Sequence, residues 1–157
     1  LVLSGTIRVV STKSTNEIIV YNTIGYSDKG VRTGRILNLY SDACVVGPEI
    51  LKHCATLNLK AELNNISGTN FRIRTGENTI LITNYLNNYV IKNSSPDIVI
   101  LRGRPYIGKD IKSGVKPQFV VISPEVSHRS QFYRMVKAIK ADSVHYVREQ
   151  GAFYLRL

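Results

Sequence analysis

Two short apolar runs, DIVIL at residues 97–101 and QFVVIS at residues 118–123, indicate the fold class of this chain. Pro96, Pro117 and Pro124 bound the runs, and proline is rarely found inside a central strand. The runs lack the alternation of apolar and polar residues that marks a strand with one face in water. We therefore expect two strands that are buried on both faces.

The segment after the second run changes to a helical pattern. Between residues 127 and 141, the apolar side chains of Phe132, Val136 and Ile139 recur on one side of the predicted helix. Basic residues occupy an arc beside them, namely Arg129, Arg134, Lys137 and Lys140. This pattern predicts an amphipathic helix with a basic flank.

The rest of the chain is rich in strands. Residues 48–57 predict one short helix, because Pro48 suits a first helical position and apolar residues follow at helical spacing. Residues 2–10 and 17–21 predict a first hairpin, and residues 71–74 and 79–83 predict another. Further strands are expected at residues 34–40, 143–147 and 152–157. A mixed sheet with helices packed on it is the simplest architecture for this order.

Composition limits the class of protein. The chain has 157 residues, 43% of them hydrophobic, which suits a single globular domain. No apolar run reaches the roughly 18 residues of a membrane-spanning helix. Because the chain begins at Leu1 and its one methionine is Met135, we expect it to be a piece of a longer protein. The formal charge of +10 makes anionic partners plausible.

Catalytic motifs are absent from the sequence. His53, His128 and His145 stand too far apart to form a metal-ligand pair within one element, so we interpret each as a surface or packed imidazole. Cys44 and Cys54 are too few for a disulfide scaffold or a four-thiolate zinc site. No serine or cysteine nucleophile motif and no phosphate-binding glycine loop is present. A site of paired carboxylates stays open, because Asp28, Asp42 and Asp97 could come together in the folded chain, although no motif in the sequence brings them together.

The strongest functional signal is cationic. Residues 102–116 predict a basic loop in which Asp110 is the only acidic residue and Tyr106 is interleaved. Such loops can hold phosphates and stack a base, although a solvated loop that keeps the protein soluble is an equal alternative, and an anionic lipid surface is a rival partner. The candidate nucleic-acid-binding residues are Arg102, Arg104, Tyr106, Lys109 and Lys112, with Arg134 and Lys137 as a flanking track on the predicted helix.

The second half of the chain resembles a known family. The resemblance rests on Asp97–Leu101, on Val115-Lys116-Pro117 with Phe119–Ser123, on the helix that follows, and on His145-Tyr146 with Gln150–Phe153. These segments are similar to the end of the metallo-β-lactamase-like domain at the C-terminus of ComEC-type competence proteins, the inner-membrane channels for DNA uptake. Residues 97–157 carry most of the similarity. It implies an α/β fold, a mixed β-sheet sandwich with flanking helices.

The chain departs from that family at the metal ligands. Where metal-binding members have His-His-Gly, this chain has Arg102-Gly103-Arg104-Pro105, and no HxHxDH run occurs between Tyr21 and Asp97. Metal-activated water needs a cation that several ligands fix. The resemblance therefore implies a degenerate, metal-free domain that binds a phosphate backbone without cutting it.

The resemblance also supplies a cellular context. It implies that residues 1–157 are a single soluble domain excised from a polytopic inner-membrane protein, lying on the periplasmic face. The expected partners are single-stranded DNA and the transmembrane channel part of the same polypeptide, with no small-molecule substrate and no cofactor. Two alternatives stay open: an interaction module that touches no nucleic acid, and a nuclease that holds magnesium with Asp or Glu ligands.

Overall fold

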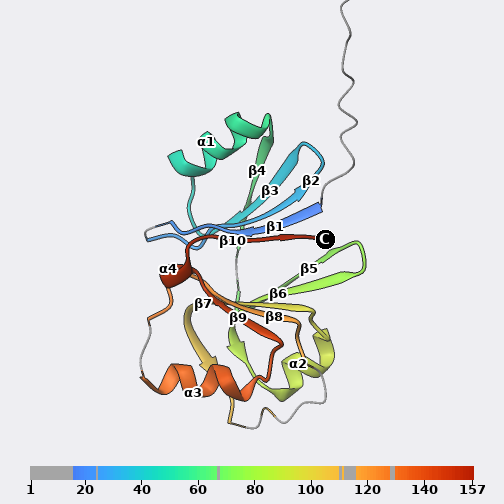
Figure 1. Cartoon of the computed structure of the whole chain (residues 1–157), viewed down its shortest axis with the longest axis vertical. Helices are drawn as coiled ribbons and strands as arrows, with labels where there is room; N and C mark the ends of the chain where they lie inside the picture. The colour runs from blue at the N-terminus through green and yellow to red at the C-terminus, as the bar shows by residue number, and fades with distance from the viewer. Residues whose placement is uncertain (1–15, 24, 67, 110, 112–115, 128–129) are drawn as a thin grey trace, which may run out of the picture.

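The computed structural model contains two five-stranded sheets that pack face to face (Figure 1). It describes residues 16–157 apart from residues 24, 67, 110, 112–115 and 128–129. The first sheet has the strand order β10-β1-β2-β3-β4. Its strands are β1 (Asn16–Val20), β2 (Lys29–Thr33), β3 (Ile36–Ser41), β4 (Lys60–Asn65) and β10 (Phe153–Arg156).

The second sheet has the strand order β5-β6-β7-β8-β9. Its strands are β5 (Asn70–Thr75), β6 (Asn78–Leu86), β7 (Ile98–Ile107), β8 (Phe119–Ile122) and β9 (Ser143–Tyr146). The strands β6 to β9 run parallel, whereas β5 is antiparallel to β6. Both apolar runs that indicated the fold class form central strands of this sheet. The expectation that they are buried on both faces is confirmed, since residues 98–101 and 120–122 are all buried.

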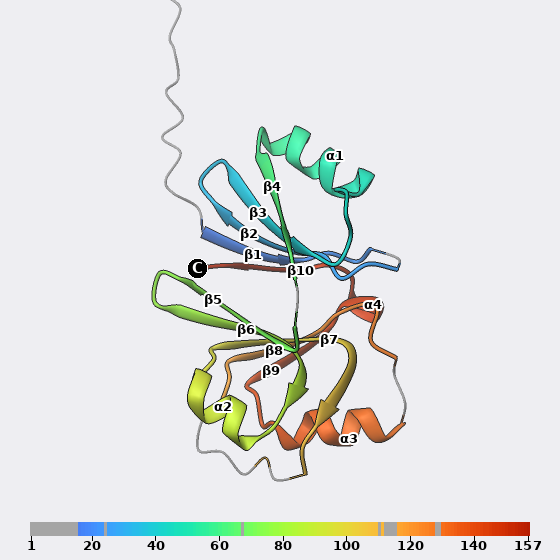
Figure 2. The ribbon, with the colours of Figure 1, turned by 180° about the vertical axis from the view of Figure 1, so that it is seen from behind.

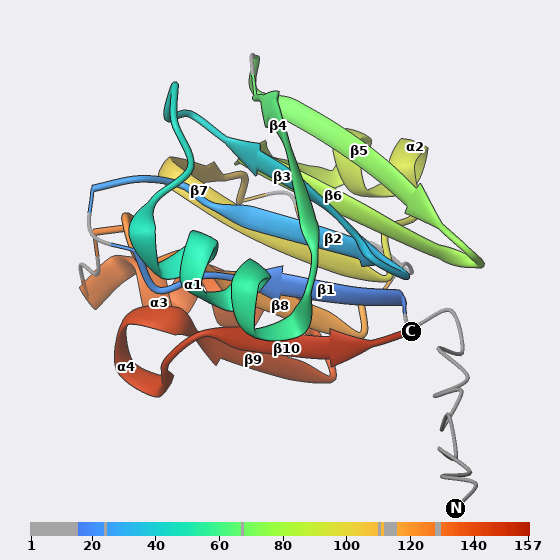
Figure 3. The same ribbon diagram turned by 90° about the horizontal axis from the view of Figure 1, so that it is seen from above.

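Helices cover the outer face of each sheet, so the molecule has four layers (Figure 2). The helices are α1 (Pro48–Leu57), α2 (Asn88–Ser94), α3 (Ser130–Ala138) and α4 (Val147–Gln150). Helix α1 packs Ile50 and Cys54 on the first sheet, and the view from above shows it lying across that sheet (Figure 3). Helices α2 and α3 pack on the second sheet, where Phe132 and Val136 of α3 are buried.

Alternation along β7 explains why its run is apolar throughout. Ile98 and Ile100 face the core between the two sheets, whereas Val99 and Leu101 face the core beneath α2 and α3. Because successive side chains of a strand point to opposite faces, a strand in the middle of four layers needs apolar residues at every position. The coarse expectation of a mixed α/β architecture with flanking helices is therefore confirmed.

Several expected elements differ from the structure. The first helix has the bounds that were predicted, but α3 covers only residues 130–138, and Lys140 beyond its end has a left-handed backbone with φ of 55°. Residues 2–10 lie outside the described part of the chain, and both edges of β1 pair with β2 and β10. The strands β2 and β4 and the helix α2 were not predicted, because their sequences are largely polar. The expectation of a loop over residues 102–107 is wrong, since these residues continue β7.

Candidate functional site

The predicted basic segment begins with a bulge inside β7. The pairing of β7 with β6 runs up to Leu101 opposite Thr83 and resumes at Tyr106 opposite Tyr85, so residues 102–105 stand opposite Asn84 alone. Gly103 has a φ of 60°, a left-handed conformation that glycine adopts without steric cost. The Thr83 hydroxyl accepts a hydrogen bond from the Tyr85 backbone N–H at 2.8 Å. The bulge therefore turns the backbone at the first two arginines of the basic segment, Arg102 and Arg104.

Past the bulge, two tyrosines form an exposed stack. The rings of Tyr85 and Tyr106 have centroids 5.3 Å apart and planes inclined by 14°. Tyr85 is 41% exposed and Tyr106 is 56% exposed, so the stack is open to solvent. Each ring limits the motion of the other, which lowers the entropy that a flat ligand would lose on stacking there. This pair is a preformed surface for a planar group.

Basic side chains lie along the chain on both sides of Tyr106. Arg104 is exposed and lies two residues before Tyr106 in β7. Lys109 is exposed just after β7 ends. Among the described residues, neither Arg104 nor Lys109 has an ion-pair partner. Both charges are therefore available to an anion.

Arg102 differs from these residues because it is partly buried. Its Nη2 donates a hydrogen bond of 2.5 Å to the carbonyl oxygen of Gly68, in the loop between β4 and β5. Its Nε is buried and has no hydrogen-bond partner in the described part of the chain. Arg102 therefore ties the bulge to the neighbouring loop, whereas Arg104 is exposed at the surface.

A buried lysine lies beside Arg102. Lys29, at the start of β2, is 1% exposed, and its Nζ lies 3.1 Å from Oε1 of Glu125 and also donates to the Ser27 hydroxyl. Burial lowers the pKa of Lys29, and the Glu125 carboxylate opposes that shift. The backbone N–H of Gly103 donates to the same Glu125 oxygen at 3.4 Å. The ion pair therefore links the first sheet to the bulge of the second.

The three aspartates that could have formed a carboxylate site do not all come together in the structure. Asp28 accepts hydrogen bonds from the hydroxyls of Thr23 and Ser41, at 2.8 Å and 2.5 Å. Asp42 lies nearby, because its Oδ1 accepts from the backbone N–H of Ser27 at 2.9 Å. Asp97 precedes β7 at the opposite end of the second sheet, where it accepts from the Thr79 N–H. Within the described residues, no group of three or more His, Cys, Asp or Glu side chains is placed to hold a metal ion.

The remaining predicted site residues come from other segments. Arg134 and Lys137 are exposed on α3, and no described hydrogen bond or ion pair joins them to β7. Lys112 lies outside the described residues. The basic residues therefore divide into a group on β7 and a separate pair on a helix.

Two histidines have packing roles, as expected. His53 Nδ1 lies 2.8 Å from the Tyr21 hydroxyl, and His145 Nε2 lies 2.9 Å from the carbonyl oxygen of Gly151. His128 lies outside the described part of the chain.

Sequence reasoning missed three residues of this region. Tyr85 stacks on Tyr106 only because parallel pairing resumes after the bulge, and nothing in the sequence signals that register. Lys29 and Glu125 are 96 positions apart. No local pattern marks a lysine whose partner lies that far along the chain.

Comparisons of this chain with protein-family models, with curated proteins and with solved structures find no match. No helix in the described part of the chain is both long and apolar enough to cross a lipid bilayer.

Proposed function

We propose that this chain is a metal-free, metallo-β-lactamase-like domain that binds single-stranded DNA without cutting it. The observation that carries the proposal is the exposed stack of Tyr85 on Tyr106, with the cations of Arg104 and Lys109, which have no ion-pair partner among the described residues, close by in the chain. Stacking on aromatic rings and contacts to the phosphate backbone are the two interactions by which proteins hold single strands without reading their sequence.

The layer order supports the lactamase-like assignment. Two sheets face each other and helices cover both outer faces, as expected for a sandwich of that family. The segment Arg102–Pro105, which replaces the family's His-His-Gly, lies beside the buried ion pair of Lys29 and Glu125. In this proposal, the Lys29 ammonium supplies the buried positive charge in the region where the resembling family keeps its metal.

The proposed contacts are of two kinds, ionic contacts to phosphates and stacking of a base. Arg104 and Lys109 neutralise phosphates, and an unstacked base lies against the open face of Tyr106. Tyr85 supports that ring from behind. Because duplex bases are already stacked on one another, a single strand gains more from the tyrosines than a duplex does.

The sequence resemblance extends the proposal to a cellular role. In it, the domain belongs to a ComEC-type channel of natural transformation, lies on the periplasmic face of the inner membrane and guides the incoming strand toward the transmembrane part of the same polypeptide. The proposal includes no small-molecule substrate and no cofactor.

Fluorescence anisotropy with a labelled oligothymidine tests DNA binding. The logarithm of the affinity should fall with the logarithm of the salt concentration, with a slope of about −0.7 for each phosphate neutralised. Arg104→Ala should make that slope less steep by about 0.7, the share of one phosphate contact. Tyr106→Ala should weaken the free energy of binding by ~1–3 kcal/mol with little change of slope. Lys52→Ala, on the exposed face of α1, is the matched control and should change neither quantity.

Two results would contradict the proposal. The first is an absence of binding at low salt. The second is loss of affinity in Lys52→Ala equal to that in Arg104→Ala, which would mean that net charge alone attracts the DNA. A nuclease assay with magnesium or manganese, together with elemental analysis of the purified protein, tests the metal-dependent alternative.

A further inference from the structure

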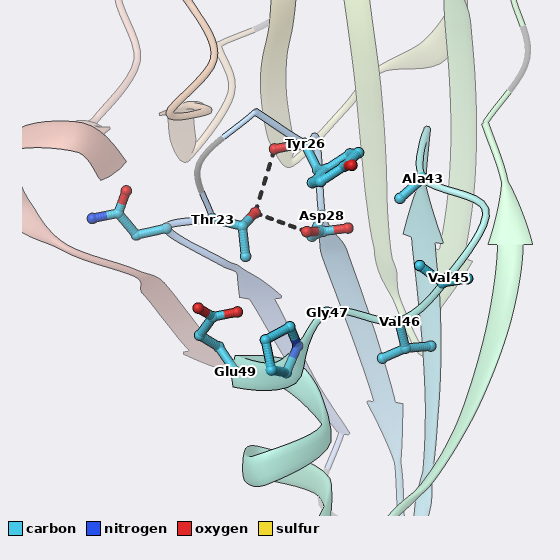
Figure 4. Close-up of a pocket in the computed structure, with 10 residues that line it drawn as sticks. Thr23, Tyr26, Asp28, Ala43, Val45, Val46, Gly47 and Glu49 are labelled. Carbon is cyan, nitrogen blue, oxygen red and sulfur yellow. Dashed lines mark hydrogen bonds between the residues drawn. The ribbon is translucent and has the colours of Figure 1, made fainter.

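A pocket opens on the first sheet, next to the beginning of α1 (Figure 4). Its volume is about 400 Å³, within the range of ligand pockets in proteins. Two segments enclose it: the turn that follows β1, and the connection from β3 to α1. The lining residues include Tyr26, Asp28, Val45, Val46, Pro48 and Glu49.

The walls of the pocket are mostly apolar. Val45 is 73% exposed and Tyr26 is 53% exposed, and both line the opening. Val46 and Pro48 continue the apolar wall toward α1. These side chains offer a surface for a hydrocarbon chain that enters the pocket.

A buried carboxylate lies at the inner side of the pocket. Asp28 is only 4% exposed, and among the described residues it has no ion-pair partner. The neighbouring Lys29 does not compensate it, because its ammonium binds Glu125. The hydroxyls of Thr23 and Ser41 fix both carboxylate oxygens of Asp28. Since buried charges are usually paired, a cationic group that enters the pocket would complement the Asp28 carboxylate.

A second carboxylate, that of Glu49, adds negative charge to the pocket. Glu49 is exposed in the first turn of α1, lines the same pocket, and has no ion-pair partner among the described residues. The start of α1 does not favour an anion here, because Pro48 lacks an N–H and Glu49 already places a negative charge beside the helix dipole. The pocket is therefore acidic although the whole chain carries a charge of +10.

We propose that this pocket binds the side chain of a lysine from a protein partner. The methylene stem lies along Val45 and Val46, and the ammonium is held by the carboxylates of Asp28 and Glu49. The ring of Tyr26 lies at the opening, where the stem enters. A lysine fits better than a bare metal ion, because apolar side chains form most of the wall and hard cations need several converging oxygens. This interaction is independent of the proposed DNA surface on β7.

Nuclear magnetic resonance with small probes tests the proposal. N-acetyl-lysine methylamide should shift the amide signals of Val45, Val46 and Gly47 with a dissociation constant in the millimolar range, as befits a ligand with few atoms. N-acetyl-norleucine methylamide has the same stem without the ammonium, and it should bind at least about tenfold more weakly.

Variants of the carboxylates locate the charge contact. Asp28→Asn and Glu49→Gln should each weaken the lysine probe by about threefold or more, and Glu49→Gln keeps the test valid if Asp28→Asn does not fold. Glu77→Gln removes the same charge at the exposed turn between β5 and β6, so it should leave binding unchanged.

The proposal is overturned if both probes shift these amides equally, because the pocket would then be merely apolar. It also fails if Glu77→Gln weakens binding as much as Glu49→Gln, if inorganic phosphate shifts the same amides instead, or if no probe shifts them. None of these results bears on binding of DNA at the tyrosine stack.

Discussion

Replacing the buried lysine of β2 by methionine tests how the two sheets are held together. Lys29→Met keeps the unbranched stem of the side chain but removes the ammonium that lies 3.1 Å from Glu125. The side chains of Lys29 and Glu125 are only 2% and 14% exposed, so water compensates little for the lost partner. The variant leaves a largely buried carboxylate whose remaining described donor is the Gly103 N–H, 3.4 Å away.

Breaking a buried ion pair on one side costs ~3–5 kcal/mol, a large part of the ~5–15 kcal/mol that stabilises a typical domain. With a urea dependence of ~2 kcal/mol per molar, the midpoint of unfolding should fall by ~1.5–2.5 M. Lys29→Met combined with Glu125→Gln removes both charges and should recover at least ~2 kcal/mol of that loss. A recovery of that size would show that the loss comes from the unpaired carboxylate and not from changed packing of the side chain.

Urea unfolding followed by far-ultraviolet circular dichroism measures both quantities, since the chain has no tryptophan to serve as a fluorescent probe. Lys60→Met is the matched control. Lys60 lies 3.0 Å from Glu62, but its side chain is 76% exposed, so the free energy of unfolding should change by less than ~0.5 kcal/mol. Equal losses in Lys29→Met and Lys60→Met, or a double variant no more stable than Lys29→Met, would refute this reasoning.

The same variant should also change how the free energy of unfolding depends on alkaline pH. Burial lowers the pKa of Lys29 below its ordinary value of 10.5, so between the folded pKa and 10.5 the unfolded chain binds more protons at this residue than the folded chain. The contribution of Lys29 to the free energy of unfolding therefore rises with pH across that window. Lys29→Met should lack this rise when the two proteins are compared by urea unfolding at successive pH values.

Three further predictions concern the first sheet and its helix. Gly30→Ala should cost ~1–3 kcal/mol in urea unfolding, because an added Cβ would lie 2.7 Å from Cδ1 of Leu37; a loss below ~0.5 kcal/mol would contradict this packing. Burial raises the pKa of Tyr21, so stability should fall above pH ~10 as the unfolded tyrosine ionises, and Tyr21→Phe should show a shallower fall. Under native conditions, iodoacetamide should modify exposed Cys44 before buried Cys54, as mass spectrometry of the peptides would show; equal rates would contradict the burial of Cys54 in α1.

The sequence by itself determined the elements with a strong local pattern. The apolar runs at residues 97–101 and 118–123 and the helix at residues 48–57 follow from hydrophobic periodicity and proline placement, which act within a few residues. It also pointed to Arg104 and Tyr106, because a charge density and an interleaved aromatic are visible without knowledge of the fold. It missed β2 and β4, whose polar residues are held in strands by backbone hydrogen bonds to neighbouring strands.

Only the tertiary structure decided how the charged and aromatic residues are combined. Stacking of Tyr85 on Tyr106 depends on the register after the bulge, and pairing of Lys29 with Glu125 joins β2 of the first sheet to the turn that follows β8 of the second. The pocket around Asp28 is lined by two connections that the hairpin of β2 and β3 separates in the sequence. Burial turns an ordinary lysine and an ordinary aspartate into groups that need partners, and burial is a property of the packed layers, not of any local stretch of chain.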